Sequence, residues 1–111
     1  MIKTINVSTS KGQEFVDITS QVQDFAASAE ADEGTITVFV PHTTAGVTIN
    51  ENADPSVVRD ILQTLEKLIP ISGNYSHAEG NSHAHVKSSL IGASCKVLFE
   101  KGKLQERLLP L

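Results

Sequence analysis

The sequence predicts a small α+β domain that has a mostly antiparallel sheet with helices packed on one face. Residues 35–40 and 93–99 alternate apolar and polar side chains, which is the pattern of half-buried strands. Residues 55–69 instead repeat apolar side chains at helical spacing. Because the strand-like segments come in pairs joined by short turns, they favour antiparallel pairing. Residues 1–111 fit one compact domain.

The N-terminal part is expected to hold two strands and a helix. Residues 2–7 and 14–18 are rich in strand-forming side chains and flank a polar turn. Thr19 or Ser20 is expected to cap the helix that follows, and the acidic run that ends at Gly34 is expected to terminate it. The apolar face of this helix consists of Val22, Phe25, Ala26 and Ala29.

The central helix has the clearest start in the sequence. A strand at residues 46–50 is expected to precede it. Asp54 fits the N-cap, and Pro55 fits the first helical position, where its missing N–H group costs nothing. Pro70 is expected to end the helix. The apolar stripe that we expect to face the core consists of Val58, Ile61, Leu62, Leu65, Leu68 and Ile69.

The C-terminal part predicts a third helix and a hairpin. Asn81 or Ser82 is expected to cap this helix. The residues that should face the core from it are Val86 and Leu90. Residues 93–99 then form a strand, and residues 100–103 turn the chain into its hairpin partner. One side of the strand carries Cys95, Val97 and Phe99.

Charge and composition disfavour some classes of partner. The net charge is -4, and Lys and Arg residues are scattered without a basic stripe, which argues against nucleic acid. No apolar run has the length of a membrane span, so no membrane partner is expected. The lone Cys95 is expected to be a buried, reduced thiol, and no signal peptide is recognisable, which together favour the cytoplasm. Lys87 is expected to be a solvated helix charge.

Residues 41–52 form a first polar segment. It carries His42 and Glu51, which approach each other if the flanking strands pair as a hairpin. A histidine beside a carboxylate is a workable acid–base pair, because the carboxylate orients the imidazole. The alternative is that Thr43 and Thr44 only satisfy a turn and that Glu51 is a solvated charge.

Residues 75–85 form a second polar segment, in which three of the four histidines of the chain lie. His83 and His85 lie on one side of an extended chain, which is a common way to begin a metal site, but they point to different faces of a helix. His77 and Glu79 add two candidate ligands for zinc or another divalent metal. The alternative is a polar surface loop with a helix cap.

The start of the third helix is a candidate anion site. Asn81 and Ser82 lie where backbone N–H groups are unpaired and the helix dipole is positive. A phosphate group would therefore find donors at this position.

The two polar segments resemble the YjbQ-like family, often labelled secondary thiamine-phosphate synthase. The resemblance extends from about Thr35 to Gln105 in order and spacing. The motifs that carry it are His42–Glu51, Asp54–Pro55, His77, Glu79–Asn81, His85, Leu90–Gly92 and Ser94.

The resemblance implies a curved antiparallel sheet, a homotrimer, and a pocket built from both polar segments at or near a subunit boundary. Family members continue beyond Gln105 with a Trp-containing stretch and an Asp-Gly-Pro-Arg stretch that this sequence lacks, so the domain is expected to be shortened near residues 105–106. His83 occupies a variable place. The residues that match the polar pattern of the family are His42, Glu51, His77, Asn81 and His85.

The resulting hypothesis is a transferase that acts on a small phosphorylated molecule, joining a pyrimidine diphosphate to a thiazole phosphate with release of diphosphate. His42 and Glu51 would move protons. His77 and His85 would hold zinc or magnesium, or would bind the anion themselves as imidazolium groups. The residues expected to hold phosphate are Thr43, Thr44, Asn81 and Ser82. Three alternatives stay open: a metal-assisted hydrolase, a non-catalytic trimer that binds a metal or small anion, and an interaction module without a ligand.

Overall fold

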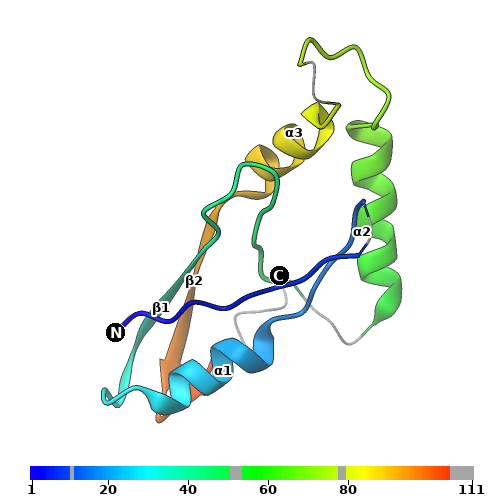
Figure 1. Cartoon of the computed structure of the whole chain (residues 1–111). Helices are drawn as coiled ribbons and strands as arrows, with labels where there is room; N and C mark the ends of the chain where they lie inside the picture. The colour runs from blue at the N-terminus through cyan, green and yellow to red at the C-terminus, as the bar shows by residue number, and fades with distance from the viewer. Residues whose placement is uncertain (11, 51–53, 78–79, 106–111) are drawn as a thin grey trace. The chain divides into compact units, whose positions relative to one another are not determined.

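The computed structural model of the chain describes residues 1–10, 12–50, 54–77 and 80–105 (Figure 1). The elements in these residues are α1 (Thr19–Ser28), β1 (Glu33–Phe39), α2 (Pro55–Leu68), α3 (Ser82–Ile91), β2 (Ser94–Glu100) and β3 (Lys103–Leu104). These helices and strands confirm the α+β fold class. The chain divides into two compact units, one of residues 1–36 with 96–111 and one of residues 37–95. Among the described helices, none has the length and apolar character needed to cross a bilayer.

The three strands form a sheet of order β1-β2-β3. β1 and β2 run in opposite directions, because Gly34 near the start of β1 lies against Phe99, whereas Val40 beyond its end donates its N–H to the carbonyl of Ala93 at 2.8 Å. The alternation expected from the sequence is also confirmed, since Ile36 and Phe99 are buried while their neighbours along each strand are exposed. The expected antiparallel sheet is thus present.

The expected hairpin joins β2 to β3. Phe99 pairs with Leu104 across it, and the amide of Gln105 donates to the carbonyl of Leu98 at 2.9 Å. Lys101 and Gly102 form the turn with φ values of 53° and 74°. A two-residue turn with both φ values positive matches the right-handed twist of the strands it connects, which explains why this sequence turns here.

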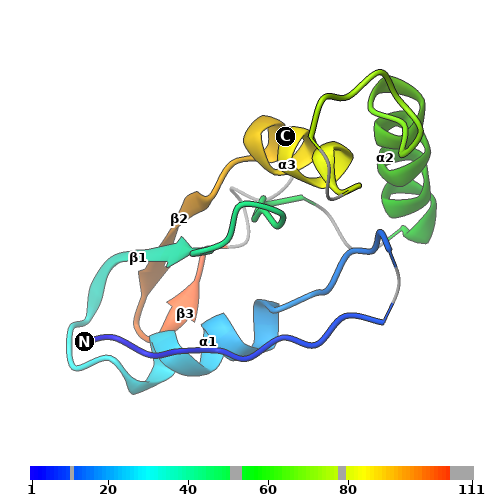
Figure 2. The ribbon, with the colours of Figure 1, turned by 45° about the horizontal axis from the view of Figure 1, so that its top comes forward.

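Helix α1 packs against β3, as Figure 2 shows. Val22 and Ala26 are the buried residues on its predicted apolar face. The side-chain amide of Gln23 also bonds to the hairpin, because its Nε2 donates to the carbonyl of Gly102 at 2.6 Å and its Oε1 accepts from the amide of Leu104 at 3.1 Å. Helix α1 and the hairpin are therefore held together by apolar packing and by hydrogen bonds from the side chain of Gln23 to the hairpin backbone.

The expectation that Thr19 or Ser20 caps α1 is wrong. The N-cap residue is Ile18, which makes no side-chain cap bond. The carboxylate of Asp17, one residue earlier, accepts from the backbone N–H of Thr19 at 2.9 Å, and its charge favours the positive end of the helix. The helix ends at Ser28, before the acidic run, and Gly34 belongs to β1.

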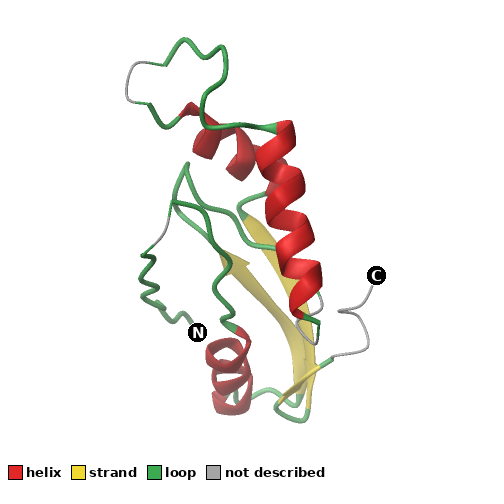
Figure 3. Cartoon of the chain, turned by 90° about the vertical axis from the view of Figure 1, so that its right-hand side faces the viewer, coloured by secondary structure: helices red, strands yellow, loops and turns green. Residues whose placement is uncertain are grey.

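The strands predicted at residues 2–7, 14–18 and 46–50 are wrong. Figure 3 draws all three segments as loop, and no strand is assigned to them. Their side chains have the propensity for strands, but a strand also requires a partner that completes its hydrogen bonds. Ile2 is 96% exposed, so the first of these apolar patterns does not reach the core.

Helix α2 begins as predicted. Asp54 is the N-cap and its carboxylate accepts from the backbone N–H of Ser56 at 2.9 Å, with Pro55 at the first position. The stripe that was expected to be core is buried only at Ile69, and Leu68 is 68% exposed. The half-buried members of the stripe are Val58, Ile61, Leu62 and Leu65.

The cap of α2 gives a pH-dependent prediction. Hydrogen bonds from the backbone and side chain of Ser56 lower the pKa of Asp54 below its ordinary value of 3.8. The cap charge therefore stabilises the folded chain fully above that value and loses its effect as the pH falls through the lower folded-state pKa. Asp54→Asn keeps a good cap without the titration. Thermal unfolding should reveal a stability difference from wild type at neutral pH that shrinks below about pH 4, and a pH-independent difference would contradict the prediction.

Helix α3 turns a different face inward from the one predicted. Val86 and Leu90 are 45% and 63% exposed, so the expectation that they face the core is wrong. Ala84, Ser88 and Ile91 are the half-buried positions at helical spacing. This half-buried face makes polar contacts with other segments. These contacts explain why it is covered although the face of Val86 and Leu90 is more apolar.

Candidate functional site

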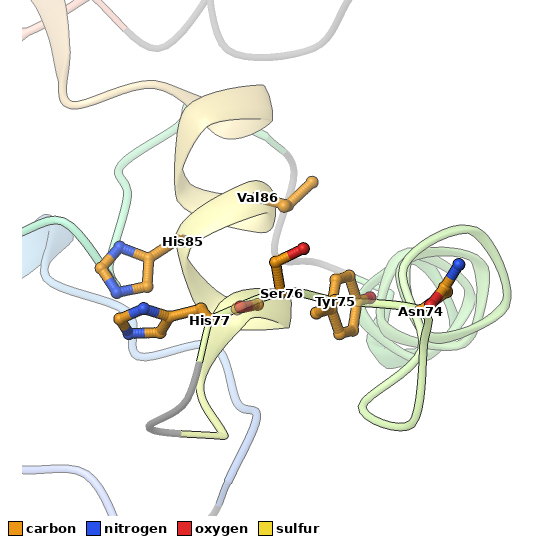
Figure 4. Close-up of a pocket in the computed structure, with 7 residues that line it drawn as sticks. Asn74, Tyr75, Ser76, His77, His85 and Val86 are labelled. Carbon is orange, nitrogen blue, oxygen red and sulfur yellow. The ribbon is translucent and has the colours of Figure 1, made fainter.

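A cavity of about 360 Å³, largely open to solvent, lies between residues 74–77 and the first half of α3, within the unit of residues 37–95. Figure 4 shows His77 and His85 next to one another, with Tyr75 and Asn74 beyond Ser76. A volume of this size suits a small ligand. The residues that line it are Asn74, Tyr75, Ser76, His77, Ser82, His85 and Val86.

The imidazoles of His77 and His85 form a pair at this cavity. Their ring centroids are 5.3 Å apart and the rings are inclined by 80°. His85 reaches this place because residues 82–91 are helical, and the same helix directs His83 to another face, so His83 does not line the cavity. The structure therefore brings together His77 and His85, which are the two residues expected to bind metal.

The spacing of the two rings is compatible with a shared ligand. Two imidazoles on one tetrahedral zinc ion place their centroids roughly 5 Å apart, given Zn–N bonds of about 2 Å. An edge-to-face ring contact has the same spacing. Imidazole suits zinc better than magnesium, which prefers oxygen ligands. Within the described residues, no three side chains of His, Cys, Asp or Glu form a group, so His77 and His85 would supply two ligands.

The start of α3 contributes one of the two residues expected there to hold phosphate. Ser82 lines the cavity, whereas Asn81 is the N-cap residue without a side-chain cap bond and does not line it. The Oδ1 atom of Asn81 and the Nδ1 atom of His83 are buried, and neither has a hydrogen-bond partner in the described part of the chain.

The loop that carries His42 is held along α3. The Oγ atom of Ser88 donates to the carbonyl of Thr43 at 2.5 Å and also contacts the carbonyl of His85 at 3.1 Å. The amide of Val47 donates to the carbonyl of Gly92, at the end of the same helix, at 3.0 Å. These bonds bring the backbone next to His42 close to the helical turn that carries His85.

The side chains of the first polar segment do not themselves line the cavity. His42, Thr43 and Thr44 are exposed, and none of them is among the lining residues. Glu51, expected to pair with His42, lies outside the described residues, as does Glu79. The hairpin that was expected to join His42 to Glu51 is absent, because residues 46–50 form no strand.

Gly46 allows this loop to approach α3. A Cβ atom at residue 46 would lie 2.8 Å from the carbonyl oxygen of Gly92 and 3.0–3.1 Å from the side chain of Ile91. Gly46→Ala should therefore lower the free energy of unfolding by about 1–3 kcal/mol. Chemical denaturation measures this change, and Gly12→Ala is the control because nothing lies within 4 Å of its added Cβ. Equal stability of the two variants would contradict the close approach.

Lys87 has a structural task and is not a solvated charge, which corrects the expectation. Its side chain is 11% exposed, and its Nζ atom lies 3.3 Å from a carboxylate oxygen of Glu66. This ion pair joins α3 to α2. A largely buried ammonium requires such a partner, and this requirement helps to set which face of α3 is covered.

Cys95 is a free, half-buried thiol, which agrees in part with the buried thiol expected from the sequence. Burial raises its pKa above the ordinary value of 9.0. The neutral thiol therefore predominates at neutral pH, and it is a poor nucleophile.

Sequence reasoning missed three contributors to the site. Asn74, which lines the cavity, lies one residue before the second polar segment. Ser88 was not singled out, because a serine inside a helix gives no signal of a bond to a distant carbonyl. Val86 was expected in the core. Tyr75 and Ser76 belonged to the second polar segment, but a role was predicted only for the histidines beside them.

Comparisons with known proteins agree on one family. A family model described as "UPF0047 protein YjbQ-like" matches residues 3–106. The chain is 47% identical over 103 residues to UPF0047 protein MJ1081 of Methanocaldococcus jannaschii, covering 93% of this chain and 75% of that protein. It is 44% identical over 105 residues to UPF0047 protein YugU of Bacillus subtilis, covering 94% and 80%.

A solved structure gives the same result. The crystal structure of an uncharacterised conserved protein of the yjbq/upf0047 family from Clostridium acetobutylicum matches with a TM-score of 0.86 and 52% sequence identity. The match covers 89% of this chain and 77% of that chain.

Proposed function

Because the chain belongs to the YjbQ-like UPF0047 family, we propose that it is a small-molecule transferase resembling secondary thiamine-phosphate synthase. Its substrates are a pyrimidine diphosphate and a thiazole phosphate. The observation that supports this proposal most is the His77–His85 pair at a cavity of ligand size, with the His42 loop bonded to the same helix through Ser88.

The protein must supply positive charge rather than a nucleophile, because the thiazole nitrogen is itself the nucleophile. This nitrogen forms a bond to the methylene carbon attached to the pyrimidine, and the bond from that carbon to the diphosphate oxygen breaks, so negative charge grows on the leaving diphosphate. Imidazolium groups of His77 and His85, the hydroxyl of Ser82 and the positive end of α3 would stabilise that charge. A zinc ion held by the two imidazoles would supply positive charge at the same place.

His42 is proposed as the group that moves a proton, which it would donate to an oxygen of the leaving diphosphate, with Glu51 as its orienting partner. Two observations support a place for His42 near the cavity, namely the bond from Ser88 to the carbonyl of Thr43 and the contact of Ser88 with the carbonyl of His85. Thr43 and Thr44 would offer their exposed hydroxyls to the second phosphate.

Turnover by the purified wild-type chain tests the proposal. The two precursors are supplied, thiamine phosphate and diphosphate are measured, and the metal content is determined by elemental analysis. Equal amounts of both products would support the transferase. Release of phosphate or diphosphate without thiamine phosphate would favour the metal-assisted hydrolase, and stoichiometric metal without turnover would favour the non-catalytic binder.

The proposal includes a homotrimer that works in the cytoplasm. Light scattering of the purified chain measures the assembly directly, and a monomer that retained full turnover would remove the trimer from the proposal.

A further inference from the structure

Tyr75 forms the aromatic wall of the cavity that contains the histidine pair. It lines the cavity between Asn74 and Ser76, whereas Val86 lines it from α3 (Figure 4). The cavity therefore has two chemically different parts. His77, His85 and Ser82 provide polar groups, and Tyr75 and Val86 provide apolar surface.

The ring of Tyr75 is held in place by its own loop. Its hydroxyl donates to the carbonyl of Pro70 at 2.5 Å, and its backbone N–H donates to the carbonyl of Gly73 at 3.0 Å. Gly73 lies so close to the ring that an added Cβ atom would be 2.7 Å from two ring carbons. The hydroxyl is thus engaged away from any ligand, and the ring offers the cavity a fixed apolar surface.

From this geometry we propose that Tyr75 is a specificity-determining residue, which selects ligands whose phosphate group carries a flat aromatic ring. A ring that is already ordered loses little conformational entropy when a ligand stacks on it. Tyr75, His77 and His85 line the same cavity. A ligand that places its phosphate beside the imidazoles could therefore place an attached aromatic ring beside Tyr75. The inference rests on the proposed function, because it assumes that the imidazoles bind a phosphate group.

Two probes with the same phosphate group test the inference. Phenyl phosphate carries a flat ring, and methyl phosphate carries none. The wild-type chain should bind phenyl phosphate about tenfold more tightly in a calorimetric titration, since an aromatic contact adds up to about 1.5 kcal/mol to the burial of the ring. Tyr75→Leu should reduce this ratio to about one while leaving the affinity for methyl phosphate within about twofold.

Gly73→Ala is a second variant that leaves Tyr75 itself unchanged. The added methyl group must displace the ring, so the preference for phenyl phosphate should fall as it does in Tyr75→Leu. Ser72→Ala, at the preceding exposed position, is the matched control and should keep the preference. Circular dichroism establishes that each variant is folded.

The outcomes separate this inference from the proposed function. No preference in the wild-type chain, or a preference that survives in Tyr75→Leu, overturns the role of Tyr75. A preference that depends on Tyr75, in a chain that makes no thiamine phosphate, supports the role of Tyr75 and overturns the transferase.

Discussion

His85→Ala is expected to reduce the turnover of the two thiamine precursors by about 100- to 1,000-fold, which is the usual effect of removing one group that stabilises transition-state charge. His85 is half-buried and its ring lies 5.3 Å from that of His77 at the cavity, so the substitution removes half of the pair. Steady-state kinetics at saturating substrate measures the effect on kcat.

His83→Ala is the matched control for this prediction. His83 lies two residues earlier on the same helix but does not line the cavity, so its removal should change turnover far less than removal of His85. His42→Ala is also expected to lose turnover, because His42 is proposed to move protons. Full turnover in both His42→Ala and His85→Ala would eliminate the assignment of the site.

Phe99→Ala is expected to lower the free energy of unfolding by about 3–5 kcal/mol. Phe99 is 7% exposed, and its ring lies against Gly34 of the neighbouring strand, so the substitution leaves a cavity beside β1. Few residues of the described chain are this deeply buried, and a small domain has only about 5–15 kcal/mol of stability in total. Denaturation by urea, followed by circular dichroism, measures the loss.

Leu98→Ala is the control for the effect of Phe99→Ala. Leu98 is next to Phe99 on β2 but points to the opposite face and is 45% exposed. Its substitution should cost much less than that of Phe99. If both variants lost the same stability, the alternation of buried and exposed faces along β2 would not describe the folded chain.

The elements that the sequence predicted correctly are those whose signals are local. Asp54 and Pro55 mark the start of α2 through the chemistry of a single turn, and Lys101 and Gly102 mark the hairpin in the same way. The alternation that buries Phe99 is also a property of one short segment. Each of these predictions needed no knowledge of what lies across the fold.

The errors have a non-local origin. Residues 2–7 carry an apolar pattern as good as that of β1, but pairing depends on a partner strand that the pattern does not specify. The inward face of α3 could not be read from Val86 and Leu90, because it is set by Lys87 with Glu66 and by Ser88 with Thr43. Those bonds join residues that are 21 and 45 positions apart.

The candidate site was predictable in part for the same reason. The density of histidines identified the second polar segment, and the helix that begins at Ser82 explains why His85, and not His83, meets His77. The part played by Tyr75 was not predictable. It depends on a bond to Pro70 and on close packing against Gly73, which are visible only in the folded loop.

The position of Gln23 bears on the aggregation of this chain, because Gln23 occupies backbone groups at the edge of the sheet. Successive residues of a strand direct their N–H groups to opposite sides. The amide of Gln105 donates to β2, so the amide of Leu104 points the other way, to the edge of the sheet that no described strand covers, and donates to Gln23. The carbonyl of Gly102 is occupied by the same side chain. An incoming strand from another molecule would have to displace this amide first, so α1 protects β3 from the sheet extension that leads to fibrils.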